Sequence, residues 1–261
     1  MYLQSDSSVI AVVTANALLV SGSPWPSPIE CLEVLDNASV LVFLDEQDRK
    51  RVIESIQYDA DDLLRALRSN TSTSWWWETR DLEFLRIVET KGDPPQSAEP
   101  RVVGNMRGAW WCEPNFWNRN GIVSAELSQS LPDNGGPVRL WCQDESAQPF
   151  NPLSTSPVSL ESLRLYVINS PQDWRSLVKR YPRKFVIRGD SSDSFWFRTT
   201  GIEIQPDWTQ VAKDYDGIHL TIGGYVTTAY VSMEIDNQYQ TTLSGWNPGE
   251  AVIFDSTRLM R

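Results

Sequence analysis

The stretch from Pro206 to Tyr230, PDWTQVAKDYDGIHLTIGGYVTTAY, combines a helix start, a helix stop, a tight turn and the chain's only histidine. A proline followed by an aspartate is typical of a helix N-terminus, and Gly217 is typical of a helix end. Beyond it, the apolar residues on either side of Gly223-Gly224 predict a β-hairpin with a two-residue turn. The stretch therefore indicates a helix followed by two antiparallel strands.

The register of this predicted hairpin assigns its side chains to two faces. With the glycines as the turn, His219 lies opposite Thr228 on a polar face. The other face belongs to the core and carries Ile218, Leu220 and Ile222. We therefore expect the histidine on the polar side of the hairpin.

Similar patterns occur elsewhere in the second half of the chain. Ser170-Pro171 predicts a helix with a serine N-cap and a proline in its first turn. Short apolar runs at 138–142, 163–168 and 251–254 predict strands. Together these patterns favour an α+β fold with a mostly antiparallel, twisted sheet and a few helices packed on one side.

The N-terminal part shows two kinds of apolar pattern. Val9–Val20 mixes Val, Ile and Thr, which predicts a strand or a pair of strands, and residues 39–44 (SVLVFL) predict a short buried strand. Residues 29–35 predict a short helix, and the spacing of apolar residues after Asp48 predicts an amphipathic one that stops at Asn70. This order indicates a smaller N-terminal β-α-β-α unit.

Residues 91–100, KGDPPQSAEP, are proline-rich, polar and without periodicity, which is typical of a linker. We therefore predict an N-terminal α/β unit over residues 1–90. A C-terminal α+β domain over residues 101–261 carries the candidate site.

The charge of the chain limits its partners. With 23 Lys and Arg against 34 Asp and Glu, the formal net charge is −11. Duplex nucleic acid or an anionic membrane surface would be repelled by this field. We therefore expect a protein partner, a small molecule or a metal.

The three cysteines and the apolar run near the N-terminus lead us to expect a cytoplasmic protein. Cys31, Cys112 and Cys142 are odd in number and lack CxxC spacing, so we expect buried thiols rather than a disulfide framework or a zinc site. The apolar run near the N-terminus has no basic segment before it, so neither a signal peptide nor a membrane span is predicted.

Tryptophan is abundant, with 12 residues that include the runs Trp75–Trp77 and Trp110–Trp111. We interpret them first as core anchors, because each indole buries a large area. The alternative is a stacking platform for a sugar, a base or a peptide.

The first candidate site is Asp214-x-Asp216-x-x-His219. Two carboxylates and an imidazole would bind a divalent metal, or Asp216 and His219 would form a catalytic acid/base pair. Acids are disfavoured at a helix C-terminus, so both aspartates need an explanation. That explanation is either such a site or a neighbouring arginine, with His219 an ordinary strand residue.

The second candidate site resembles the NAD-binding pattern of arginine-type ADP-ribosyltransferases. There an arginine contacts phosphate, a Ser-Thr-Ser strand orders the site and a glutamate contacts the ribose. The matching residues are Arg107, Ser154, Thr155, Ser156 and Glu234. The chain departs from the pattern at Ser232, where that family has an acid or a glutamine, and in the long spacing to Glu234.

The segments SPQDWRSLVKRYP, PDWTQVAKDYDGIHLTIGGYVTTA and GWNP resemble an uncharacterised family of proteins from high-GC Gram-positive bacteria. That family shares a DW helix ending in proline, then PDW, VA, DYD, VHL and GYLT motifs and a GW-x-P turn. The resemblance covers residues 165–250 and implies a bacterial, cytoplasmic setting. Its His-Asp-Trp segment corresponds here to Arg188–Trp196, which lacks histidine.

Three functions remain open at this point. The charge favours an acidic binding protein that engages a protein or a small ligand, with toxin neutralisation as one form. The alternatives are an NAD-dependent mono-ADP-ribosyltransferase and a metal-assisted enzyme centred on Asp216 and His219. A Walker A loop, a GxSxG elbow and an HExxH motif are all missing from the sequence.

Overall fold

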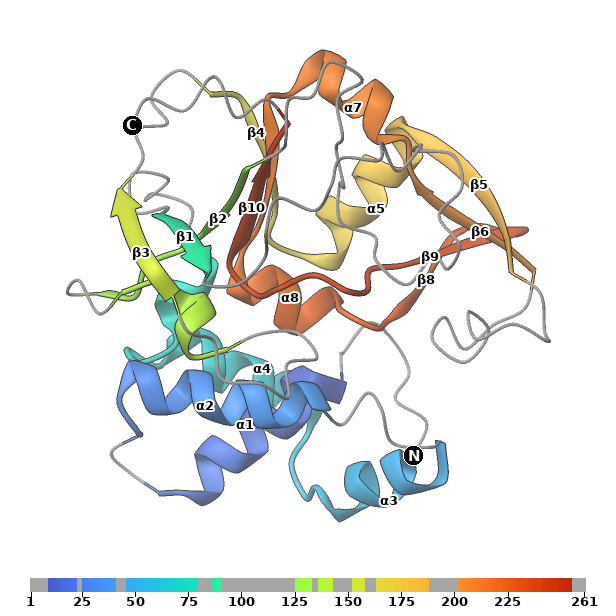
Figure 1. The fold of residues 1–261 in the computed structure, drawn as a ribbon. Coiled ribbons are helices and arrows are strands. Elements are labelled where there is room, and N and C mark those ends of the chain that lie inside the picture. The colour runs from blue at the N-terminus through green and yellow to red at the C-terminus, as the bar shows by residue number, and fades with distance from the viewer. Residues whose placement is uncertain are drawn as a thin grey trace.

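The computed structural model describes residues 9–22, 25–40, 46–78, 86–90, 125–132, 136–142, 152–157, 163–187 and 201–254. Within these ranges the chain combines helices with two β-sheets. Figure 1 shows the N-terminal helices in the lower half of the molecule and both sheets above them. The predicted α+β class is confirmed.

The described residues before 79 form helices only. They are α1 (Val9–Val20), α2 (Pro28–Ser39), α3 (Glu46–Ser55), α4 (Ala60–Ser69) and the short 3-10 helix η2 (Ser74–Trp77). The strand predicted over Val9–Val20 is wrong, and with it the start of the β-α-β-α unit. An apolar run without periodicity fits a buried helix as well as a strand. Packing of α1 against α2 and α4 decides between them.

Local capping explains where two of these helices begin. Ser27 and Glu30 form a capping box at the start of α2, with Pro28 in its first turn. The helix predicted over 29–35 is confirmed and is longer than expected. Helix α4 starts at the N-cap Asp59 and ends at Asn70, which is the predicted stop.

The larger sheet has six strands in the order β3-β1-β2-β10-β7-β4. Its strands are β1 (Arg86–Thr90), β2 (Ala125–Ser128), β3 (Pro152–Pro157), β4 (Leu165–Ile168), β7 (Gly217–Leu220) and β10 (Glu250–Ile253). Only the β4–β7 pair is parallel among these described strands. The strand predicted at 138–142 is instead the 3-10 helix η5 (Val138–Leu140).

The smaller sheet has four strands in the order β5-β6-β9-β8. They are β5 (Pro182–Ile187), β6 (Gly201–Pro206), β8 (Ser232–Asp236) and β9 (Tyr239–Thr242). The β6–β9 pair is parallel and its neighbours are antiparallel. The mostly antiparallel character that the sequence predicts is therefore confirmed in both sheets.

Strand β1 connects the two predicted domains. It precedes the expected linker at 91–100, which lies outside the described residues, and it pairs with β2 and β3, which follow that linker. The described residues on both sides of the linker thus share one sheet.

In the part of the chain that the structure describes, three helices accompany the sheets: α5 (Pro171–Arg180), α7 (Trp208–Asp214) and α8 (Ile222–Thr228). Helix α5 starts at Ser170, whose side chain accepts the Asp173 N–H as predicted. It contacts β4 of the larger sheet and β5, β6 and β8 of the smaller one. Figure 1 shows it between the two sheets, so its apolar face contributes to both.

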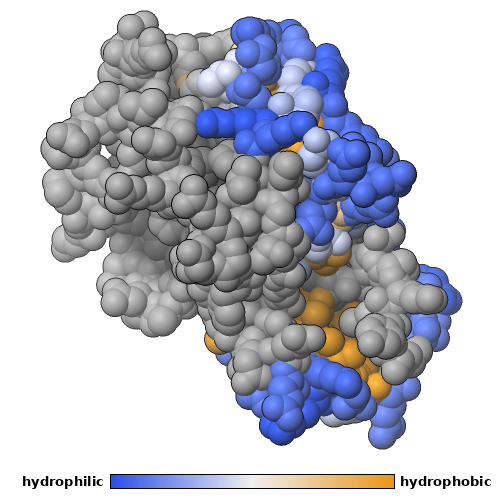
Figure 2. All heavy atoms as spheres, turned by 90° about the vertical axis from the view of Figure 1, so that its right-hand side faces the viewer, coloured by the Kyte–Doolittle hydropathy of each residue, from blue (hydrophilic) through white to orange (hydrophobic). Residues whose placement is uncertain are grey.

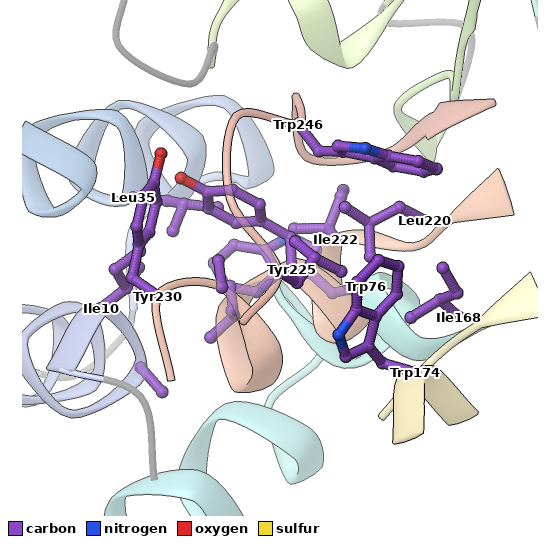
Figure 3. Close-up of a cluster of buried hydrophobic side chains, with 14 of the residues drawn as sticks. Ile10, Leu35, Trp76, Ile168, Trp174, Leu220, Ile222, Tyr225, Tyr230 and Trp246 are labelled. Atoms are coloured by element: carbon purple, nitrogen blue, oxygen red, sulfur yellow. The ribbon is translucent and has the colours of Figure 1, made fainter. Parts of the chain in front are cut away.

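One hydrophobic core extends from the N-terminal helices to both sheets. Figure 3 shows Trp76, Trp174 and Trp246 around Tyr225 at its centre, and all four side chains are fully buried. Trp75 is buried as well and Trp77 is half-buried, so the core interpretation of this run is confirmed for its first two residues. Trp110 and Trp111 lie outside the described residues.

Two of the three cysteines are described, Cys31 and Cys142, and both are buried free thiols as expected. In the part of the chain that the structure describes, no helix has the length and apolar character needed to cross a membrane.

Candidate functional site

The helix predicted in the focal stretch is present and carries the first candidate residue. Asp207 caps α7 by accepting the Thr209 N–H, and Trp208 and Val211 bury its apolar face. The helix ends at Asp214, and β7 begins at Gly217. The acids of the candidate site thus lie between a helix C-terminus and a strand.

Asp214 is half-exposed and contacts the end of α5. Arg180 Nη2 lies 3.0 Å from Asp214 Oδ2, and the Tyr181 hydroxyl donates to the same oxygen. The Tyr181 hydrogen bond first, and then Arg180, hold the pKa of this carboxyl below its usual value. A neighbouring arginine, one of the two predicted explanations, accounts for an acid at this helix end.

Asp216 is buried and joins two strands. Its Oδ2 accepts the Arg164 backbone N–H at 2.8 Å, and its own N–H donates to the Arg164 carbonyl at 2.8 Å. The Arg164 Nε lies 3.5 Å from the same carboxylate oxygen, and the Asp216 carbonyl accepts the Phe254 N–H at 3.0 Å. These contacts fix the start of β7 between β4 and the end of β10.

His219 lies in the interior of the larger sheet. It is 3% exposed, and its register partners are Ala251 in β10 and Val167 in β4. Neither ring nitrogen makes a hydrogen bond with a described residue. Burial lowers the pKa of His219 to about 4, so the ring is neutral at pH 7. The predicted position of His219 opposite Thr228 on the polar face of a hairpin is wrong, because Thr228 lies in α8.

The three residues predicted to bind a metal therefore have different surroundings. Asp214 pairs with Arg180, Asp216 pairs with Arg164, and His219 is enclosed between two strands. Among the described residues, no group of three or more His, Cys, Asp or Glu side chains is arranged to bind a metal ion. The structure does not bring this candidate metal site together, nor does it pair Asp216 with His219 as acid and base.

The predicted hairpin is also wrong, because Gly223 and Gly224 lie in the first turn of α8. Thr221 caps this helix by accepting the Gly224 N–H at 2.9 Å, and its hydroxyl donates to Asn169 Oδ1 at 2.6 Å. A Cβ on Gly223 would overlap the indole of Trp77, and one on Gly224 would overlap the Ile168 carbonyl oxygen. The two glycines permit close packing rather than a turn.

The residues of the transferase pattern are not brought together where they are described. Ser154, Thr155 and Ser156 lie on β3, at one edge of the larger sheet, and Glu234 lies exposed on β8, at an edge of the smaller sheet. Figure 1 shows β3 and β8 on opposite sides of the molecule. Arg107 lies outside the described residues.

The structure adds a polar group that sequence reasoning missed. Glu203 and Gln205 on β6 are 0% and 5% exposed, and burial raises the pKa of Glu203 to about 8. The Gln205 amide donates to the Thr242 carbonyl at 2.9 Å. The alternation in GIEIQP is the signal that would have predicted this strand, with Ile204 in the core and the two polar residues on the other face.

No protein-family model, curated protein or solved structure matches this chain.

Proposed function

We propose that the protein is an acidic binding protein of the bacterial cytoplasm, which engages a cationic protein partner. The resemblance of residues 165–250 to a bacterial family supports the setting. One observation supports the binding role more directly. Most of the described cationic side chains contact acids or aromatic rings of the chain, whereas several exposed acids have no counter-ion among the described residues.

Eight of the described cationic side chains contact acids or aromatic rings of the same chain. In the described ranges, six of them form ion pairs: Lys50, Arg51, Arg65, Arg139, Arg164 and Arg180. Arg68 lies 5.2 Å from the centre of the Trp77 ring, and Lys184 lies 4.3 Å from that of Tyr239. These contacts engage most of the cationic side chains that the structure describes.

Four acids differ from this pattern. They are exposed, and within the described part of the chain their carboxylates form neither an ion pair nor a hydrogen bond: Glu33, Asp61, Glu78 and Glu234. They come from α2, α4, the residue after η2 and β8. With a net charge of −11 behind them, such side chains attract a basic protein from solution.

The surface in Figure 2 supports a macromolecular partner. Described residues on this face are mainly hydrophilic in the upper half, and an apolar patch with hydrophilic residues below it lies in the lower half, at the height of the N-terminal helices. Polar and apolar surface side by side is typical of protein interfaces. A basic toxin neutralised by contact with this acidic surface would be one partner of this kind.

The test compares two variants with the same net charge. The first neutralises the four unpaired acids as Glu33→Gln, Asp61→Asn, Glu78→Gln and Glu234→Gln. The control neutralises four acids that already form ion pairs, as Asp48→Asn, Glu54→Gln, Asp62→Asn and Asp214→Asn.

Proteins that the wild type captures from the host are purified. Their affinity for the wild type and for both variants is then measured by surface plasmon resonance. We expect a basic partner of fixed stoichiometry, an association rate that falls with salt, and roughly tenfold weaker binding of the first variant than of the control. Equal binding of the two variants, or a partner without net positive charge, would contradict the proposal.

A further inference from the structure

Strand β8 lies at one edge of the smaller sheet. The strand order β5-β6-β9-β8 gives it a single neighbour, β9, among the described strands. In an antiparallel pair, every second residue directs its backbone N–H and C=O away from the neighbouring strand. Figure 1 shows β8 on the lower side of this sheet and β5 on its upper side. Strand β8 thus presents backbone donors and acceptors at the sheet edge.

These outward backbone groups have no partner in the part of the chain that the structure describes. Apart from the pairing with β9, no backbone hydrogen bond of a described residue involves Ser232, Met233, Glu234 or Ile235. The side chains of Ser232 and Glu234 are exposed, and so is that of Asp236 at the end of the strand. Solvent therefore reaches the strand along the face that carries Ser232 and Glu234.

The two edge strands of the smaller sheet differ in the residues that prevent further pairing. Natural edge strands avoid pairing with other chains by means of proline, lysine and bulges. Strand β5 has Pro182 and Lys184, whereas β8, with the sequence SMEID, has neither residue type. Its bulge lies between Glu234 and Asp236 and leaves Ser232–Glu234 in regular register. This regular part of β8 can accept a further strand.

Charge determines which strand fits there. Glu234 forms neither an ion pair nor a hydrogen bond through its carboxylate within the described part of the chain. Opposite charges directly across two strands stabilise the pair, and like charges destabilise it. A second copy of this chain would bring the same net charge of −11 to the edge. A segment with lysine or arginine next to Glu234 is therefore favoured over a second copy.

The two faces of β8 define the side chains of a strand added beside it. Met233 is 3% exposed and belongs to the hydrophobic core, and the half-buried Ile235 packs against that core. Ser232 and Glu234 lie on the exposed face. Because side chains alternate between the two faces of a strand, those of the added strand alternate as well. Its apolar residues lie beside Met233 and its basic residues beside Glu234.

We propose that the edge of β8 binds an extended basic segment of the cationic protein partner as an additional strand. The segment's backbone pairs with the outward N–H and C=O groups of β8, a mode of binding that needs no preformed cavity. A lysine or arginine beside Glu234 selects basic segments. This inference rests on the proposed function and assigns a surface to it.

The test uses the peptide acetyl-Lys-Val-Arg-Val-Lys-amide as probe. One control is the same peptide with every backbone nitrogen methylated, which keeps the charge and removes the donors. The other control has glutamate in place of each basic residue. Calorimetry on the full chain at pH 7 should show saturable binding of the probe and, for both controls, roughly tenfold weaker binding or less. Absence of saturable binding of the probe, or equal binding of the methylated peptide, would overturn the proposal.

Amide hydrogen exchange of the full chain, followed by NMR, locates the probe. At saturating peptide, the outward amides of Ser232–Glu234 should exchange roughly tenfold more slowly or less, because they become hydrogen-bonded. The amides of β4, an edge strand of the larger sheet, should keep their rates. Saturable binding without slower exchange in β8 would show that the peptide lies elsewhere and that the proposal is wrong.

Two variants with the same net charge test the role of Glu234. Glu234→Lys reverses the charge at the edge, and Glu78→Lys reverses that of an exposed acid outside the smaller sheet. The probe should bind Glu234→Lys roughly fivefold more weakly than Glu78→Lys. Equal affinity for the two variants would contradict the assignment.

The purified partner separates this inference from the proposed function. If the partner binds the wild type but exchange in β8 is unchanged in the complex, the assigned edge is wrong and the binding role stands. If exchange in β8 slows with rising protein concentration and no peptide, a second copy occupies the edge and the proposal is wrong. If no cationic partner binds the wild type, the binding role itself is wrong.

Discussion

The carboxylate of Asp216 accepts the backbone N–H of Arg164 at 2.8 Å, across 52 residues of sequence. The same two residues also join through the Asp216 N–H and the Arg164 carbonyl. This pair of contacts aligns the first residues of the parallel strands β4 and β7. The sequence suggested Asp216 as one member of a catalytic acid/base pair. In the structure its contacts hold the strands β4 and β7 in register.

Removal of this anchor should destabilise the protein. Asp216→Ala removes the charged acceptor of the Arg164 N–H, which costs about 1.5–3 kcal/mol of unfolding free energy. Asp216→Asn keeps an acceptor oxygen and should lose less. Urea unfolding followed by far-UV circular dichroism measures both. Asp214→Asn, which alters a solvent-exposed pair, is the control and should lose least.

His219 should make the protein sensitive to acid. Its pKa is 6.5 in an unfolded chain and about 4 in the fold, so the unfolded state binds the proton more tightly. The stability that depends on a neutral ring is complete above pH 6.5 and is lost as pH falls through 4. At about 1.4 kcal/mol per pKa unit, the loss is on the order of 3 kcal/mol.

Replacement of His219 by leucine should remove this part of the acid sensitivity. The unfolding free energy of His219→Leu, measured by urea titration from pH 7 to pH 4, should fall less than that of the wild type. If the unfolding free energies of the two proteins fall in parallel with pH, burial does not lower the pKa of His219.

Glu203 should have the opposite dependence on pH. Its folded-state pKa of about 8 lies above the ordinary 4.5, so its contribution to stability is complete below pH 4.5. That contribution is lost as pH rises through 8, by an amount on the order of 5 kcal/mol. Glu203→Gln should therefore be more stable than the wild type at pH 8.5 and should lose little stability between pH 5 and pH 8.5. Thermal unfolding across this range measures the difference, and a wild-type melting temperature that does not fall on the alkaline side would contradict it.

The two glycines of α8 should not tolerate a methyl group equally. Gly224→Ala would press against the Ile168 carbonyl, which is backbone, and Gly223→Ala against the side chain of Trp77. We expect each substitution to lower the free energy of unfolding by about 1–3 kcal/mol, with the larger loss at Gly224. In a Trp77→Leu background, the cost of Gly223→Ala should decrease because the indole is gone. Chemical denaturation of the four variants tests this order.

Local signals in the sequence predicted the starts and ends of several helices. Ser170 with Pro171 and Asn70 act as expected, because a cap is satisfied by backbone groups within a few residues. Alternation likewise predicted that Ile218 and Leu220 belong to the core.

The candidate site was harder to predict because its residues acquire their roles from distant partners. Asp214 depends on Arg180 of α5, and Asp216 depends on Arg164 before β4. Glu203 of β6 lies beside Gln240 of β9 in the smaller sheet. Each of these pairs is separated by at least thirty residues, and no periodicity in one segment encodes them.

The sequence by itself therefore determined the α+β class, the helix caps and the acidic character of the surface, since these follow from local hydrogen bonding, apolar periodicity and composition. Tertiary structure decided that Val9–Val20 is a helix, that Gly223 and Gly224 begin a helix instead of forming a turn, and that His219 is enclosed between strands. The physical reason is the same in each case. A short apolar or glycine-containing segment fits more than one local conformation, and the close packing of Trp77, Ile168 and the neighbouring helices selects one of them.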